Sequence, residues 1–484
     1  MKHLIIAAVI LLVLVEAVGM LWSPKGTAPD GTFAKLSEPP RRFIDNPYHN
    51  GYFYFFGLTA SPPLDPTRVG YEIWVEESEE SRRAGLDEHG TSRDDLRLTI
   101  PPQLTAMAWE ADEPLNEFQK NDTVLHEAIA HQQTLLARYE RWLELPFEDW
   151  GFGHRVTPRY QDIMSTHRFY VVEGFSLGTL QGLERLRKEL QFWRLVLREA
   201  KTIRTKVLAQ VVMTDDLNFL SRILAKPTVD PAILTMGLQL TLPLSESEYS
   251  LRWPIRNQLA LVVKETPTGG VQNGNQRQRD RDQDEWLLRE GKLPLDAFDS
   301  IEHPPSQAML GVTLQSGQAW NTYAAYYNAI ITASESKARS LPGMREVTGT
   351  LQRGLIEKLV NPHLNEPDWA IFHRKLMETD TRLRLASLQI QLRRPSAQTA
   401  VPTRLAEVGS QYFDPFTGLP MLWSPTQHKL YSVGRDRLDD GGDPTFDISV
   451  PTIVATTQAS EKDPIHASPL PRSTHPKKTR SRHL

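Results

Sequence analysis

The chain has 484 residues, enough for one large hydrophobic core or about two to three smaller ones. It contains no cysteine, which excludes disulfide bonds, cysteine-ligated zinc, iron–sulfur clusters and a cysteine nucleophile. Its formal net charge of −4 is unlike that of a nucleic-acid-binding protein, so we expect no nucleic-acid partner.

The N-terminus carries a long apolar segment. After Lys2, residues 4–22 are apolar except for Glu16, and the run ends on a tryptophan. At about 1.5 Å per residue it is about 28 Å long, close to the thickness of the hydrocarbon core of a bilayer. An interfacial tryptophan favours a retained helix, so we predict that residues 1–22 form a single-pass anchor in the bacterial inner membrane, with the body in the periplasm. The alternative is a signal peptide cleaved near Gly19, which would release a soluble periplasmic protein.

Residues 23–102 are predicted to form a stalk followed by an extended aromatic segment. The run Asn50–Gly57 (NGYFYFFG) contains consecutive aromatic side chains. One interpretation is an exposed strip that binds a partner. Because contiguous aromatic patches seldom remain exposed, a buried strand or an extended cover over the core is favoured.

Residues 103–400 show the apolar periodicity of a helical body. A stripe from Leu125 to Leu143 predicts an amphipathic helix that ends at Pro146. A second helical block covers residues 160–224, and strand alternation is scarce, so the predicted fold is mainly α. The seam of this block consists of Leu183, Leu186, Leu190, Trp193 and Leu197, and further helical patterns occupy residues 230–240, 286–288, 316–341, 344–360 and 368–394.

The run 266–284 is rich in Gly, Gln and charged residues. Such a composition cannot bury apolar area, so the sequence predicts a disordered loop. The loop would either separate two helical subdomains or be a long insertion within one.

Residues 174–178 (GFSLG) match the G-x-S-x-G motif of serine hydrolases, with Ser176 as the candidate nucleophile. That motif requires a strand before the serine, whereas the flanking patterns here are helical. Gly174, Gly178 and Gly182 recur at every fourth position, which would place small residues on one helix face. We therefore favour close helix packing and keep a serine hydrolase as the alternative.

His126 and His131 resemble a zinc-binding helical motif but are separated by five positions. Zinc motifs of this kind place two histidines four positions apart, on one helix face. A separation of five rotates them about 140° apart, so we expect two outward-facing polar residues.

The C-terminal part is predicted to contain a small β cassette over residues 405–452, followed by a basic, disordered tail over 455–484. The cassette contains a dense group of aspartates. These carboxylates repel one another unless they are solvated or neutralised by a cation, and calcium is the cation that suits oxygen ligands outside the cytoplasm. A plain acidic surface turn is an equal alternative. The candidate ligands are Asp436, Asp439, Asp440, Asp443 and Asp447.

The stretch Asp414–Asp447, with DPFTGLPM and LYSVGRDRLDDGG, resembles a C-terminal cassette of uncharacterised, exported, membrane-anchored bacterial proteins. It is also similar to the C-terminal turn of type II secretion pseudopilins, which implies calcium binding. Pseudopilins have a glutamate before or early in their apolar run, whereas Glu16 comes late, so the chain is not interpreted as a pseudopilin. Leu190–Leu224 resembles the membrane-anchored group, which implies no particular activity.

Together these patterns predict an anchored envelope protein with a binding or scaffolding role and an unidentified envelope protein as partner. No coherent set of catalytic residues emerges, so a non-enzymatic role is favoured over the hydrolase that would use Ser176. Calcium bound by the C-terminal aspartates would stabilise the body.

Overall fold

The computed structural model describes residues 31, 35–36, 38–80, 116, 120–154, 157–265, 274–298, 317–343, 346–347, 369–393 and 400–454. The helical elements are η1 (Pro47–His49), η2 (Gly51–Phe53), α3 (Tyr54–Gly57), α4 (Pro66–Glu80), α8 (Asp122–Trp142), α9 (Tyr160–Leu177), α10 (Thr179–Glu199), α11 (Ile203–Leu224), α12 (Pro231–Leu240), α13 (Glu246–Tyr249), α14 (Arg252–Glu265), α15 (Gly274–Glu290), α18 (Gly317–Glu335), α21 (Trp369–Leu392), α22 (Val401–Glu407) and η3 (Ser410–Tyr412). The strands are β1 (Leu422–Ser424), β2 (Lys429–Ser432) and β3 (Ile448–Pro451).

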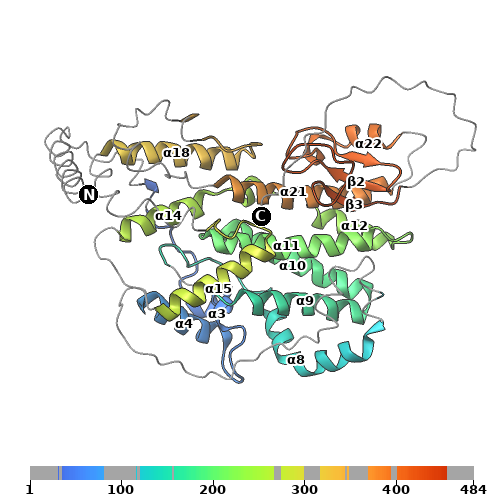
Figure 1. Ribbon diagram of the computed structural model, residues 1–484. Helices are drawn as coiled ribbons and strands as arrows, with labels where there is room; N and C mark the ends of the chain where they lie inside the picture. Colours follow the sequence, from blue (N-terminus) through green and yellow to red (C-terminus); the bar gives the residue numbers. More distant parts are fainter. Residues whose placement is uncertain are drawn as a thin grey trace, which may run out of the picture.

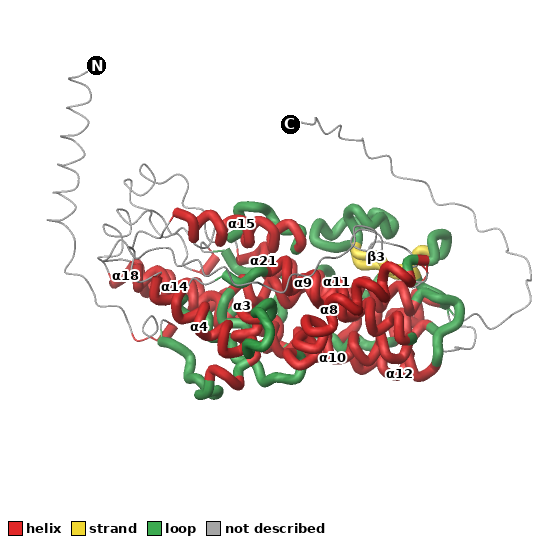
Figure 2. Tube along the Cα trace, turned by 90° about the horizontal axis from the view of Figure 1, so that it is seen from below, coloured by secondary structure: helices red, strands yellow, loops and turns green. Residues whose placement is uncertain are grey.

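The centre of the body is a stack of long helices in the order α8, α9, α10, α11 and α21 (Figure 1). Short turns join α9 to α10 and α10 to α11, so these neighbouring helices run antiparallel. The sheet lies toward one end of the body, whereas α14 and α18 lie at the other (Figure 2). The prediction of a mainly helical fold with a small β cassette is confirmed for the described residues.

Helices α9 and α10 approach each other closely because glycines face each other across the turn. A Cβ atom at Gly174 would lie 3.1 Å from the Cα atom of Gly182, and a Cβ atom at Gly182 would overlap the ring of Phe175. Gly178 has φ +136°, a conformation that favours glycine, and it separates the two helices. The predicted packing role is therefore confirmed for two of the glycines, but the expectation that all three share one helix face is wrong.

The aromatic run near residue 50 is buried, as predicted, but it is helical rather than a strand or an extended cover. Asn50 accepts a hydrogen bond from the backbone N–H of Tyr52 and starts η2. The Trp142 indole donates to the carbonyl of Gly51 at 2.7 Å, which ties this turn to α8. Helix α4 follows, so this part of the predicted stalk is a packed helical unit. Local capping and burial against α8 override the strand preference of the aromatic residues.

The polar run that was predicted to be a loop is helical from Gly274 onward, as α15. Residues 266–273 lie outside the described part. Leu287 and Leu288 are buried at the C-terminal end of α15. Asp284 accepts from Arg204 of α11 at 2.5 Å, and Glu290 accepts from Arg168 of α9 at 3.0 Å. The helix therefore depends on tertiary ion pairs and two leucines, which composition alone does not reveal.

The C-terminal cassette is a three-stranded antiparallel sheet in the order β1-β2-β3, with Leu422 opposite Tyr431 and Leu430 opposite Val450. The sheet and α22 pack against α21 through a small apolar cluster. This cluster contains Leu385, Leu388, Leu392, Leu405, Met421, Leu430 and Val450.

Several predictions concern residues that the structure does not describe: the anchor over 1–22, most of the predicted helix over 344–360, and the tail over 455–484. Within the described part, the helices are all too short or too polar to cross a bilayer.

A buried lysine joins the end of α10 to the start of α11. The Lys206 amine is almost fully buried and donates to the carbonyl of Leu197 at 2.9 Å, in the last turns of α10. Burial lowers the pKa of Lys206 to about 7, and the charge of Glu248 offsets this only in part. The folded state therefore binds fewer protons at this amine than the unfolded chain does.

The substitution Lys206→Met is expected to change how stability depends on pH. A base whose pKa is lowered on folding makes the protein more stable as pH rises from the folded pKa toward the ordinary value of 10.5. The free energy of unfolding of the wild type, minus that of the variant, should rise by up to about 1.4 kcal/mol per pH unit between about pH 7 and pH 10. Urea unfolding at several pH values measures this difference, and parallel pH curves would contradict the prediction.

Candidate metal centre in the helical core

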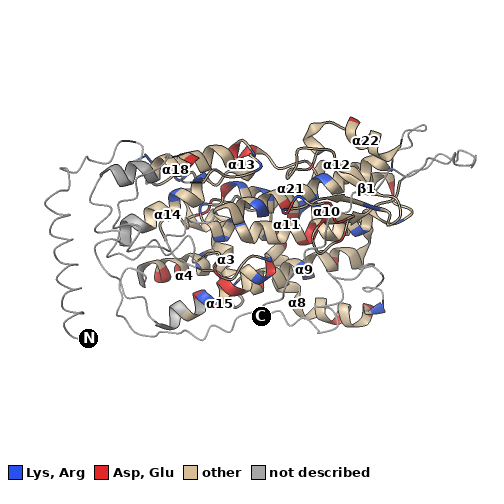
Figure 3. Ribbon diagram, turned by 45° about the horizontal axis from the view of Figure 1, so that its top comes forward, with Lys and Arg blue, Asp and Glu red and all other residues tan. Residues whose placement is uncertain are grey.

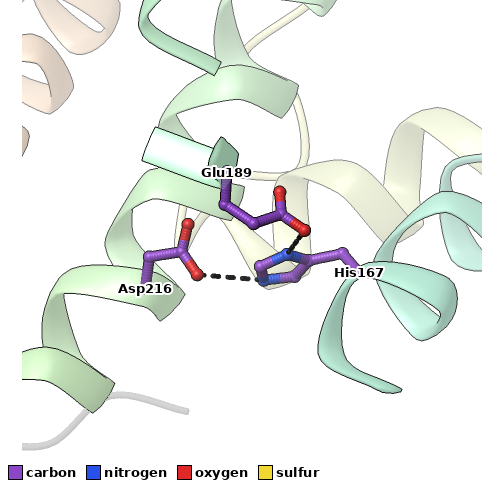
Figure 4. Close-up of side chains that lie close together, drawn as sticks. All are labelled: His167, Glu189 and Asp216. Atoms are coloured by element: carbon purple, nitrogen blue, oxygen red, sulfur yellow. Dashed lines mark ion pairs between the residues drawn. The ribbon is translucent and has the colours of Figure 1, made fainter. Parts of the chain in front are cut away.

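Three ionisable side chains meet in the interior of the helical stack. His167 comes from α9, Glu189 from α10 and Asp216 from α11. All three side chains have no solvent exposure. Both carboxylates face the imidazole ring (Figure 4).

Each ring nitrogen of the histidine faces a different carboxylate. Nδ1 of His167 lies 3.4 Å from Oε1 of Glu189, and Nε2 lies 3.7 Å from Oδ1 of Asp216. The two carboxylates nevertheless lie near each other, because one oxygen of each is within 4.8 Å of the other and of a ring nitrogen.

Each of these residues belongs to the apolar stripe by which its helix packs into the core. His167 is one helical turn from Ile163 and Tyr170, both of which are buried. Glu189 follows the buried Leu186, and Asp216 lies between Met213 and Phe219 in the same way. Residues three or four apart share a helix face, so each polar side chain occupies a position that packing would assign to an apolar residue.

The two carboxylates differ in their surroundings. Oε2 of Glu189 accepts hydrogen bonds from the Trp193 indole at 2.8 Å and the Tyr139 hydroxyl at 3.1 Å. Among the described residues, neither oxygen of Asp216 has a hydrogen-bond donor, and neither does Oε1 of Glu189. Buried carboxylate oxygens without donors lose hydration, and no described group replaces it with a hydrogen bond.

These surroundings change the proton affinities of the site. Burial raises the pKa of Asp216 well above its usual range, and the charges of Glu189 and Asp215 raise it further. Burial also raises the pKa of the Tyr139 hydroxyl, with a further contribution from the charge of Glu189. Both shifts follow from burial and from the negative charge of neighbouring carboxylates.

The arrangement has the composition and spacing of a metal site. Each of the three residues offers a ligand atom, and these atoms lie within 4.8 Å of one another. In the part of the chain that the structure describes, this is the one group of three or more His, Cys, Asp or Glu side chains with that property. Facing helices of a bundle commonly build metal sites in this way.

A protonated histidine bridging the two carboxylates is the alternative arrangement. Its hydrogen bonds would be about 2.7–2.9 Å long. Two ligands of one tetrahedral zinc ion, each about 2.0–2.2 Å from the metal, are about 3.4 Å apart. Both separations, 3.4 and 3.7 Å, are longer than such hydrogen bonds, and the 3.7 Å between Nε2 and Asp216 is closer to the spacing of two ligands of one metal ion.

The G-x-S-x-G serine does not lie on a nucleophile elbow. Ser176 is in the last turns of α9, and its hydroxyl donates to the carbonyl of Glu173 in the same helix at 2.7 Å. The preceding residues 169–172 are helical, so the strand that a hydrolase elbow requires is replaced by a helix. His126 and His131 are exposed on α8, as expected.

The five C-terminal aspartates lie in turns around β2 and β3. Several of their carboxylates accept hydrogen bonds from backbone N–H groups two residues further along the chain. Asp436 accepts from Leu438, and Asp443 accepts from Thr445. Asp439 also accepts from the Tyr431 hydroxyl, and Asp447 accepts from Gly442. Asp440 is the fifth member of this group. The structure does not bring any three of the five carboxylates within 4.8 Å of one another.

The sequence contained a signal for the buried site that its interpretation missed. Each member is an ionisable residue at an apolar stripe position, and this occurs in three consecutive helices. One such residue is commonly a satisfied core polar group. Three of them in adjacent helices of one block, at His167, Glu189 and Asp216, indicate a shared site.

A comparison with protein-family models, with curated proteins and with solved structures found no match to this chain.

The substitution Tyr139→Phe should destabilise the metal-free protein by about 1.5–3 kcal/mol, because it removes a hydrogen bond to a buried carboxylate. Urea unfolding in the presence of a chelator measures the change. The matched control is Tyr170→Phe. The Tyr170 hydroxyl lies 3.5 Å from Glu140, so its removal should cost less stability. Equal losses in the two variants would contradict a specific role for Tyr139.

Proposed function

We propose that this chain is a non-enzymatic, metal-binding protein of the bacterial envelope, with the ion held in the core of its helical body. The observation that carries this proposal is the buried group of His167, Glu189 and Asp216, in which three of the four carboxylate oxygens have no hydrogen-bond donor among the described residues. A divalent cation would neutralise both carboxylates and join three helices. The role is then structural: the ion holds the body in shape for a partner in the envelope.

The ligand set favours a first-row transition metal over calcium. Imidazole nitrogen suits zinc, iron, nickel and copper, whereas calcium takes six to eight oxygen ligands. The buried group supplies one imidazole and two carboxylates. Full burial also suits a structural site, because catalytic zinc sites keep an open position for water or substrate.

The envelope location rests on the apolar segment of residues 4–22 and on the resemblance of the C-terminal cassette to exported proteins. The formal charge of −4 favours a protein or small-ion partner over nucleic acid. In Figure 3, Lys and Arg lie among Asp and Glu along the described helices, which agrees with that preference.

Metal removal tests the central part of the proposal. The full chain, loaded with Zn²⁺ and dialysed, should retain about one ion per chain in elemental analysis. At 100 times its dissociation constant the ion should add about 2.7 kcal/mol to the free energy of unfolding, and Ca²⁺ should not replace it. His167→Gln should abolish both effects. His126→Gln, the same change at an exposed position of α8, is the control. Equal stability with and without metal would contradict the proposal and favour the protonated histidine.

Cell fractionation tests the location. In a Gram-negative host the full chain should sediment with membranes, resist alkaline extraction and be cleaved by protease added to spheroplasts, because residues 4–22 would anchor it with the body outside. Release into the periplasmic fraction would indicate cleavage near Gly19 instead. Protection from protease would contradict export.

A further inference from the structure

The two carboxylates of the core site can be given different roles, in an inference that rests on the proposed metal binding. The starting point is that Glu189 faces Nδ1 of His167 and Asp216 faces Nε2. One ion cannot bind both ring nitrogens of one histidine, so one carboxylate shares the ion with the ring and the other faces the remaining nitrogen.

We propose that the ion binds on the Nε2 side of His167, where His167 and Asp216 are its ligands, and that Glu189 is a positioning residue that accepts a hydrogen bond from Nδ1. Metal-bound histidines usually donate their other N–H to a carboxylate or carbonyl, which sets the tautomer and the ring orientation. Glu189 lies 3.4 Å from Nδ1, on the side where such an acceptor is needed.

The hydrogen bonds of the two carboxylates support this assignment. Glu189 is held in place by Tyr139 and Trp193, which donate to its other oxygen. Asp216 has no donor on either oxygen among the described residues, so both oxygens are available to a cation. With Nε2 of His167, they offer three ligand atoms from two side chains.

The mirror arrangement would place the ion on the Nδ1 side, between His167 and Glu189. It would offer the ion one carboxylate oxygen without a donor, Oε1 of Glu189, because Oε2 already accepts two hydrogen bonds, whereas Asp216 offers two. Ligand oxygens compete with hydrogen-bond donors for the same lone pairs. The mirror arrangement is therefore disfavoured.

Cobalt substitution tests the assignment, because the visible d–d absorption of bound Co²⁺ reports its ligands and not the stability of the fold. In the full chain, Asp216→Asn should abolish the Co²⁺ band. Glu189→Gln keeps an oxygen that can accept from Nδ1, so the band should stay at the same wavelengths while affinity falls about 10–100-fold. The matched control is Asp215→Asn, which removes a neighbouring carboxylate that pairs with Arg168.

Each outcome separates the two levels of the proposal. Loss or displacement of the band in Glu189→Gln, or an intact band in Asp216→Asn, would overturn the assignment while leaving metal binding in place. Failure of the wild type to take up either Co²⁺ or Zn²⁺ would overturn metal binding itself. Circular dichroism identifies a variant that does not fold. If Asp216→Asn does not fold, the Glu189→Gln spectrum alone decides the assignment.

Discussion

The structure depends on one constraint: two carboxylates and an imidazole are buried without solvent exposure between three helices. Removing a carboxylate from water costs several kcal/mol unless a charge or hydrogen bonds compensate for it. Tyr139 and Trp193 compensate in part at Glu189, whereas Asp216 has no comparable donor. A cation shared with His167 would complete the compensation, which is why the metal explains the site better than packing alone does.

The geometry that brings these groups together is set by the hairpin of α9 and α10. Gly174 and Gly182 let the two helix backbones approach closely, and Gly178 allows the sharp turn between them. The hairpin places His167 near Glu189, and the following antiparallel helix brings Asp216 to the other ring nitrogen. A larger residue at Gly182 would separate the helices, because packed interiors have little spare volume.

Much of the fold follows from local sequence patterns, and the exceptions have physical causes. The long apolar stripe of residues 160–224 predicted α9 to α11 because helical periodicity is a local property. Composition misassigned residues 274–284, the polar first part of α15, which ion pairs to other helices stabilise. It also misassigned the backbone of the aromatic run, although the burial of Tyr52 and Phe53 followed from their hydrophobicity.

The sequence by itself determined the helical class, the small C-terminal sheet, the exclusion of cysteine chemistry and the packing role of two glycines. It also contained the three ionisable residues of the core, each on an apolar stripe. Only the tertiary structure decided that these stripes face one another, because 22 and 27 residues separate His167 from Glu189 and Glu189 from Asp216. The relative position of side chains on different helices is set by packing, which no local pattern encodes.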